Sequence, residues 1–403
     1  MKQINLDDLK QDFSLLNQPN LHYFDNACQT LRPRQVITAM TQYYEEYPAC
    51  GGRSMHRLAA QVTKQCEAAR QLVADFIGAK RKDEIVFTRN TTEGINLVAN
   101  SLNLKAGDVV LTTDKEHNSN LIPWQVLAKK LGIAHVIVPS KSDNTFDLEA
   151  YKQLLETYPV KLVSMAMTSN LDGVSIPADQ VVALAHQHQA LVLFDGAQAV
   201  PHHSVNVHRL DVDFLAFSGH KMLGPSGIGV LFGKFQLLED LNPFLVGGDT
   251  VSSSTYTTQE FLPPPEKFEA GLQDYAGIIG LGAAITYLTR IGLSAIEAHE
   301  LELNTYVTKA LTSIKDLKIL GPGDPKARGG IVSFYIPGKD HHQIALMLDE
   351  SAGFLVRSGQ HCVHSWFAHQ QIPGTVRASF YFYNTMEEAK AFVQSLQKVV
   401  SIL

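Results

Sequence analysis

The sequence has 403 residues, of which 45% are hydrophobic and 18% charged, and its formal net charge is −6. This composition is typical of a folded globular protein, and the acidic balance argues against nucleic acid as a main partner. No apolar run approaches the roughly 20 residues of a membrane span. Residues 1–11 are polar and lack the apolar core of a secretion signal. We therefore expect a cytoplasmic protein with no membrane partner, whose four scattered cysteines are free thiols.

Short apolar segments alternate with amphipathic ones through the first two thirds of the chain. Because most of the short segments are continuous apolar runs, they indicate strands buried on both faces. The expected strands are Glu84–Thr88, Val109–Thr113, His135–Pro139, Lys161–Met167, Leu191–Asp195, Val212–Phe217 and Gly227–Phe232. The expected helices between them include Thr92–Leu102, Ile122–Leu131, Leu148–Thr157 and Ala178–His188. This alternation predicts an α/β fold with a mostly parallel seven-stranded sheet, and the last two strands are close enough to include an antiparallel one.

The C-terminal third predicts a smaller α+β unit. The prolines of Leu262–Pro265 interrupt regular structure and indicate a surface connection. Expected elements after it are the helices Gly277–Arg290 and Ser294–Ile314, the strands Ile331–Tyr335, Leu355–Ser358 and Val376–Ser379, and the helix Met386–Leu403. We expect residues 21–292 to form a large domain, with residues 1–20 and 293–403 forming a small domain.

A carboxylate and a lysine follow two neighbouring expected strands. Asp195 ends the run Leu191–Asp195, and Lys221 follows Val212–Phe217. In open α/β sheets the carboxyl ends of strands face the ligand crevice. Taken alone, either residue is more easily explained as a loop cap or a solvated side chain. Together they suit pyridoxal 5′-phosphate (PLP), whose ring nitrogen pairs with an acid and whose aldehyde forms a Schiff base with a lysine.

Two earlier segments add features of a phosphate-bearing cofactor site. Thr91 and Thr92 follow an expected strand and open a helix, whose N-terminal N–H groups suit a phosphate. A simple helix cap explains these threonines equally well. His117 follows Val109–Thr113 and is placed to stack on a pyridine ring, although a lone histidine is more often structural.

Eight segments in order carry a family resemblance. They are YFDNACQTLRP, FTRNTTEGINLVANS, TTDKEHNSNLIPWQ, TSNLDG, LFDGAQAV, FSGHKMLGPSGIGVL, KFEAG with GIIGLGAAI, and RSGQHC with VRASFYFYNT. They span about residues 20–385 and resemble the SUF-type cysteine desulfurases of the class V aminotransferase family. The resemblance implies a fold type I PLP enzyme that acts as a homodimer with its sites at the subunit interface.

The resemblance also implies roles for individual residues. Lys221 is the implied Schiff-base lysine, Asp195 pairs with the pyridine nitrogen, and His117 stacks on the ring as a catalytic residue. The other implied cofactor contacts are Gln198 to the phenolic oxygen, Thr91, Thr92, Ser218 and His220 to the phosphate, Asn170 beside cofactor and substrate, and Gly271 and Leu272 from the other subunit. The implied substrate contacts are Arg377, which suits a carboxylate, together with Arg357, Asn170 and Arg53.

Cys362 stands in RSGQHC, where the family keeps its sulfur-accepting cysteine. The implied reaction converts L-cysteine to L-alanine and leaves the sulfur on Cys362 as a persulfide. We expect Arg357 and His361 to favour the thiolate by their positive charge. The chain after Cys362 is short, which implies transfer to a docking protein acceptor rather than a long mobile arm. A metal site at His361, Cys362 and His364 is disfavoured by the tight spacing.

Several positions depart from the resemblance. Gly52, Ser54, Leu272 and Ser365 replace residues usual in the family, which puts pocket shape, acceptor docking and one phosphate contact in doubt. Cys28 stands where many relatives have alanine; a place near the active site is one alternative for it, and a packed small residue is the one that we expect. Four alternatives to a desulfurase remain open: a selenocysteine lyase, another carbon–sulfur lyase, an aminotransferase and a non-catalytic scaffold.

Overall fold

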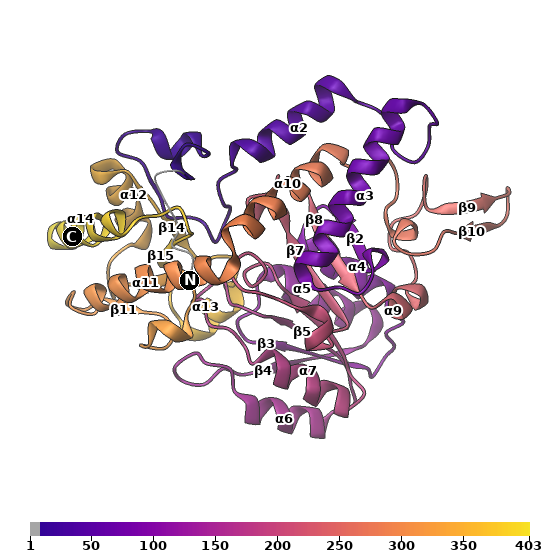
Figure 1. Ribbon diagram of the computed structural model, residues 1–403. Coiled ribbons are helices and arrows are strands. Elements are labelled where there is room, and N and C mark those ends of the chain that lie inside the picture. Colours follow the sequence, from indigo (N-terminus) through magenta and orange to yellow (C-terminus); the bar gives the residue numbers. More distant parts are fainter. Residues whose placement is uncertain (1–8) are drawn as a thin grey trace.

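The computed structural model describes residues 9–403, and its centre is a seven-stranded sheet (Figure 1). The strand order is β2-β8-β7-β6-β5-β3-β4. The strands are β2 (Ile85–Thr88), β3 (Val109–Thr113), β4 (Ala134–Val138), β5 (Val160–Ala166), β6 (Leu191–Asp195), β7 (Phe214–Ser218) and β8 (Gly229–Gly233). β8 runs antiparallel to both neighbours. The predicted mostly parallel sheet and the antiparallel strand among its last two members are both confirmed.

Alternate residues of these strands pack against two helical layers. Val110 and Leu193 belong to the hydrophobic cluster of α4 (Thr91–Ser101), α5 (Asn118–Leu131) and α9 (Phe235–Asp240). Their neighbours Leu111 and Phe194 point to the opposite face. Helices on that face are α3 (Arg57–Ile77), α6 (Leu148–Thr157), α7 (Ala178–Gln187) and α10 (Tyr275–Ile291), with α2 (Arg34–Glu46) packed on α10. Because both faces are covered, the strands are almost continuously apolar.

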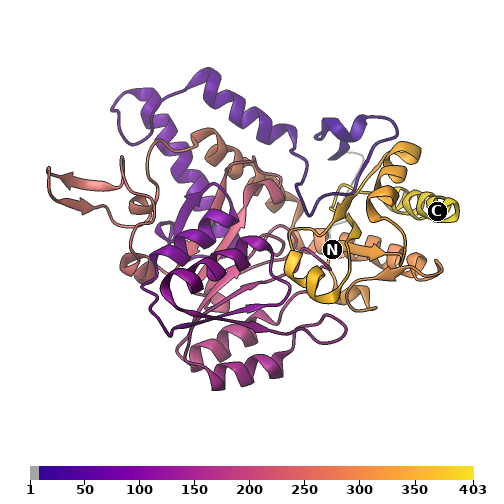
Figure 2. The ribbon, with the colours of Figure 1, turned by 180° about the vertical axis from the view of Figure 1, so that it is seen from behind.

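A second, four-stranded antiparallel sheet lies beside the first (Figure 2). Its order is β11-β12-β15-β14, formed by β11 (Lys318–Ile319), β12 (Ile331–Tyr335), β15 (Thr375–Ser379) and β14 (Arg357–Gly359). It shares a separate hydrophobic cluster with α11 (Leu293–Leu311), α12 (His341–Ala352) and α14 (Met386–Ile402). The proposed division into residues 21–292 and the remainder stays a prediction.

One expected strand is wrong. Leu355–Ser358 is two strands, because β13 (Phe354–Leu355) pairs with β1 (His22–Tyr23), whereas β14 pairs with β15. Val356 lies between them, where the chain passes from one pairing partner to the other. β14 therefore leads directly into the segment that carries Cys362.

The sequence reasoning also missed an exposed hairpin, which projects from the molecule (Figure 1). It consists of β9 (Val251–Ser254) and β10 (Gln259–Phe261), and its serine and threonine residues gave no clear hydrophobic alternation. The expected surface connection that follows is partly wrong, because Pro264 and Pro265 are buried.

Among residues 9–403, no single helix is long and apolar enough to cross a membrane. α10 and α11 pass that test only as a pair, and they are bent by 72° relative to each other.

Candidate active site

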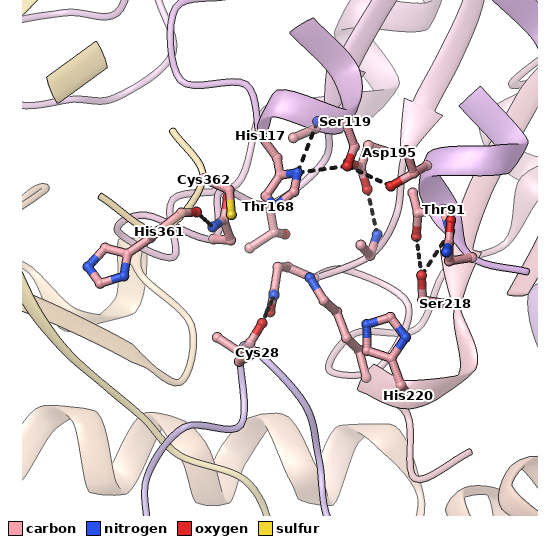
Figure 3. A pocket seen from close by; sticks show the side chains of 18 of the residues that line it. Cys28, Thr91, His117, Ser119, Thr168, Asp195, Ser218, His220, His361 and Cys362 are labelled. Carbon is pink, nitrogen blue, oxygen red and sulfur yellow. Dashed lines mark hydrogen bonds between the residues drawn. The ribbon is translucent and has the colours of Figure 1, made fainter. Parts of the chain in front are cut away.

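A cavity of about 240 Å³ lies at the carboxyl ends of the parallel strands. Figure 3 shows side chains that line it. The segments after β2, β3, β5, β6 and β7 form one wall, and β14, β15 and the Cys362 segment form the opposite wall. Predicted site residues in its lining are Thr91, Thr92, His117, Asn170, Asp195, Gln198, Ser218, His220, Lys221, Arg357, Cys362 and Arg377. The fold therefore brings twelve predicted residues to one cavity at the expected sheet edge.

Asp195 and Lys221 place an acid and an amine in this cavity. Asp195 is buried at the end of β6, where its Oδ1 accepts a hydrogen bond of 2.9 Å from the Ala197 N–H. Burial raises the pKa of Asp195, and Lys221 opposes this rise. Burial lowers the pKa of Lys221, which favours its neutral amine, although Asp195 opposes the shift. A neutral amine is the form that can bond to an aldehyde.

Hydroxyl groups gather at the first turn of α4. Ser218 Oγ accepts a hydrogen bond of 2.8 Å from the Thr91 N–H and lies 2.6 Å from Thr91 Oγ1. Thr92 Oγ1 lies 2.7 Å from Ser119 Oγ. Burial lowers the pKa of the nearby His220 to about 4. A helix N-terminus with several hydroxyl donors suits a phosphate group.

His117 caps α5 and is held by Ser119. Its Nδ1 accepts a hydrogen bond of 3.1 Å from the Ser119 N–H and lies 2.9 Å from Ser119 Oγ. Burial, followed by the nearby charge of Lys221, lowers the pKa of His117 to about 3. The ring is therefore neutral near pH 7 and carries its proton on Nε2. A neutral flat ring suits stacking on an aromatic cofactor.

The fit to PLP is supported by an unpaired buried atom. Gln198 Nε2 donates a hydrogen bond of 2.7 Å to the Ala27 carbonyl, whereas Gln198 Oε1 is buried without a partner among residues 9–403. Buried polar atoms normally have partners, so a polar ligand is expected here. An acid, an amine, a neutral aromatic ring and a hydroxyl-rich helix terminus in one cavity fit a PLP ring, aldehyde and phosphate.

Arg377 provides a buried cation on the opposite wall. Its Nη1 donates a hydrogen bond of 2.9 Å to the Asn170 carbonyl, and its Nη2 lies 3.3 Å from Asp25 Oδ1. Its Nε is buried without a partner. Asp25 was missed, because no spacing in the sequence links it to residue 377. The ion pair holds Arg377 at the cavity, where it can bind a substrate carboxylate.

The Cys362 segment has an unusual backbone. His361 and Cys362 both have positive φ, at 49° and 61°, in the left-handed region that L-residues rarely adopt. Two hydrogen bonds hold the segment: Asn170 Nδ2 to the His361 carbonyl at 2.7 Å, and the Asn118 N–H to the Cys362 carbonyl at 2.8 Å. Cys362 is half-buried in the cavity lining. Its backbone is thereby fixed rather than free to swing.

The expected role of His361 as a cation beside Cys362 is wrong. Burial, followed by the nearby charge of Arg377, lowers the pKa of His361 to about 2. Its Nε2 lies 2.7 Å from Thr375 Oγ1. His361 is thus a neutral, buried support for the segment, and Arg357 remains the predicted cation.

The lowered pKa of His361 makes the stability of the folded protein depend on pH. Its pKa is lower in the folded chain than the ordinary 6.5, so its contribution is complete above pH 6.5 and is lost as the pH falls. Between pH 6.5 and 4.5, we expect the unfolding free energy of the wild type to fall about 2 kcal/mol more than that of His361→Gln. Denaturant unfolding at both pH values measures this difference. The exposed His208 provides the control, because His208→Gln should keep the wild-type dependence.

The expectation for Cys28 is also corrected. Cys28 is half-buried and lines the cavity, and Arg357 Nη1 donates a hydrogen bond of 2.9 Å to its Sγ. It is therefore not simply a packed small residue. β1 pairs with β13, and Asp25 after β1 forms a bridge with Ser379 of β15; these long-range contacts, which local sequence patterns do not reveal, bring Cys28 to the cavity.

Three predicted residues lie outside the cavity of this chain. Arg53 forms an ion pair with Asp249 and lines a second cavity, and its contact with the substrate stays a prediction. The Gly271 N–H donates to the Gly248 carbonyl at 2.7 Å, and Leu272 is 63% exposed. The contribution of Gly271 and Leu272 to a second subunit's site stays a prediction.

The remaining departures lie at the periphery. Gly52 has a φ of 74°, which a residue with a side chain adopts only with strain, and its N–H donates to Thr63 Oγ1. Ser54 is exposed. Ser365 lies in the first turn of α13 (His364–Gln370), so the chain becomes helical directly after the Cys362 segment. Other lining residues that the sequence reasoning missed are Asn90, Ser119, Ala166 and Thr168. The available signal was that Asn90, Ser119 and Thr168 come after expected strands, whereas Ala166 lies near the end of one.

The family described as Aminotransferase class-V matches residues 22–392. The chain belongs to the class-V aminotransferase family. Within that family it is 40% identical to a probable cysteine desulfurase of Streptomyces coelicolor, over 98% of this chain and 97% of the relative. It is 39% identical to a cysteine desulfurase of Klebsiella pneumoniae, over 99% of both chains.

Solved structures of this family give the same result. The apo structure of a cysteine desulfurase from Thermococcus onnurineus superimposes with a TM-score of 0.95, at 39% identity over all of both chains. The cysteine desulfurase CsdA from Escherichia coli, an S-sulfonic acid form, superimposes with a TM-score of 0.92 at 32% identity over all of both chains. The similarity of this member of the class-V aminotransferase family to cysteine desulfurases therefore extends over its full length.

Proposed function

We propose that this protein is a PLP-dependent cysteine desulfurase that converts L-cysteine to L-alanine and carries the sulfur on Cys362. The observation that carries the proposal is one cavity that contains Lys221, Asp195, Arg377 and a half-buried Cys362. The full-length similarity to cysteine desulfurases supports it. A PLP site alone would suit many reactions; the thiol opposite the lysine favours sulfur transfer.

Different residues of the cavity would bind the cofactor and the substrate. The ring of PLP would be held by Asp195, Lys221, Gln198 and His117. The first turn of α4 would hold its phosphate. When bound, PLP supplies an electron sink that weakens the carbon–sulfur bond of the substrate. Arg377 binds the substrate carboxylate and so fixes the direction in which the substrate side chain points.

Lys221 and Cys362 perform the proton and sulfur transfers. Burial lowers the pKa of Lys221, so its amine is suited to accept and return a proton at the substrate carbon. The Cys362 thiolate attacks the substrate sulfur, so an S–S bond forms as the C–S bond breaks. The electron pair of the broken bond stays with the substrate, which takes up a proton and leaves as alanine.

The proposal also covers the partners and the location of the protein. A homodimer would allow Gly271 and Leu272 to reach the phosphate of a second subunit, and Leu272 is exposed as such a contact requires. The fixed backbone at Cys362 favours a docking protein acceptor, because the thiol cannot travel far. A cytoplasmic location belongs to the same proposal.

Product analysis separates this function from its alternatives. With PLP, L-cysteine and a thiol reductant, we expect the wild type to release alanine and sulfide in equal amounts. Pyruvate and ammonia would instead indicate a carbon–sulfur lyase. Amino transfer to an added keto acid would indicate an aminotransferase, and turnover of selenocysteine alone would indicate a selenocysteine lyase.

A further inference from the structure

The cavity contains a second thiol that the proposed reaction does not use. Cys28 reaches it from the segment after β1, and Cys362 from the segment between β14 and α13. Figure 3 shows both beside the same cavity. Both cysteines line this cavity together with Lys221 and Arg357. Cys28 is therefore part of a cluster of reactive groups rather than an isolated cysteine.

Arg357 marks Cys28 as a site for negative charge on sulfur. Its Nη1 donates to Cys28 Sγ at 2.9 Å, and a guanidinium at that distance stabilises a thiolate or a persulfide anion. Arg357 also lies only five positions before Cys362 in the sequence. The same cation therefore contacts Cys28 and belongs to the segment that leads to Cys362.

Two buried polar atoms indicate that a ligand belongs on this side of the cavity. Gln198 binds the carbonyl of Ala27, next to Cys28, while its Oε1 has no partner. Arg377 Nε is likewise buried and unpaired, and Cys28 contributes to the charge that Arg377 experiences. Both atoms belong to residues that line the same cavity as Cys28, and a molecule bound in that cavity would complete their hydrogen bonds.

We propose that Cys28 is a second sulfur-carrying residue, which takes the outer sulfur of the Cys362 persulfide and holds it against Arg357. This inference rests on the proposed function, because that reaction supplies the persulfide. The Cys28 thiolate attacks the outer sulfur, a new S–S bond forms at Cys28, and Cys362 leaves as a thiolate. One S–S bond breaks as another forms, so no oxidant is required. The extra sulfur extends the reach of Cys362 by about 2 Å.

The consequence is a chain that stores sulfur. Once Cys28 carries the first sulfur, Cys362 is free to accept another from a second substrate molecule. Without reductant or acceptor, each chain would then form more alanine before it stops than a single acceptor thiol allows.

The test is the mass of the cysteine-containing peptides after the PLP-loaded wild type reacts with L-cysteine without reductant, followed by alkylation. We expect an added sulfur on the Cys28 peptide as well as on the Cys362 peptide. Cys28→Ala should reduce the alanine formed per chain in this experiment to roughly half, because one of two sulfur-carrying thiols is lost. Cys50→Ala is the matched control, since Cys50 lies outside the cavity lining and should leave the yield unchanged.

Two results would overturn the inference while the proposed function stands. The first is an added sulfur on Cys362 with none on Cys28. The second is an added sulfur on Cys28 in Cys362→Ser, because Cys28 would then take sulfur directly from the substrate. If wild type forms no alanine and neither peptide gains sulfur, the proposed function itself fails.

Discussion

Replacement of Lys221 by alanine should reduce the turnover of L-cysteine by about 10⁴-fold or more, because general acid–base catalysis alone contributes about 10²–10⁴. The covalent attachment of PLP is lost in addition. Lys221 combines a place in the cavity lining with a pKa lowered by burial, so its amine is free both to bond to an aldehyde and to move a proton. The measurements are the visible absorption band after addition of PLP and the rate of alanine release.

Lys221→Arg makes this prediction sharper. It keeps a positive charge and much of the side-chain volume beside Asp195, but the guanidinium remains protonated and forms no stable bond with the aldehyde. We expect the same loss of turnover as in Lys221→Ala. Lys129→Ala, on the exposed last turn of α5, should behave as wild type. An arginine or alanine variant that kept both the absorption band and the turnover would remove Lys221 from the mechanism.

Replacement of Cys362 by serine should lower the release of alanine and sulfide by several orders of magnitude while PLP remains bound. The serine hydroxyl has nearly the same size, but it is a far weaker nucleophile than a thiolate at neutral pH. Because Asn170 and Asn118 hold the backbone of this segment, the substitution should leave the cavity in place. The rates are compared with Cys50→Ser as the control for loss of a cysteine elsewhere.

Two results for the Cys362→Ser variant would contradict or complicate this prediction. If Cys362→Ser kept the wild-type rate, sulfur would leave the substrate without a protein thiol, and a direct carbon–sulfur lyase would describe the protein better. If PLP binding were lost together with turnover, the variant would report on the cavity rather than on sulfur transfer, and Cys362→Ala would be the variant to compare.

The sequence predicted the half of the site that rests on the central sheet. Asp195, Ser218 and Lys221 follow neighbouring strands, and the carboxyl ends of parallel strands necessarily meet at one edge. The predicted strands agreed with the observed ones because residues buried on both faces leave a continuous apolar run. The same reasoning explains the correct placement of His117 and Asn170.

The other half depends on contacts that no local pattern contains. Cys28 reaches the cavity, and Asp25 reaches Arg377, only because β1 pairs with β13, more than three hundred residues away along the chain. The positive charge expected of His361 is absent because the ring is buried, and burial of a loop residue cannot be read from its neighbours in sequence. Arg53 forms an ion pair with Asp249, which lies just before the β9–β10 hairpin. The sequence of that hairpin has no clear hydrophobic alternation, so this contact could not be predicted.

The most direct test of the account is the mass of the Cys362 peptide after the PLP-loaded wild type reacts with L-cysteine without reductant. The account predicts one added sulfur on Cys362, which a thiol reductant removes as sulfide, with alanine as the other product. Alanine and sulfide formed while Cys362 stays unmodified at every time point would contradict it.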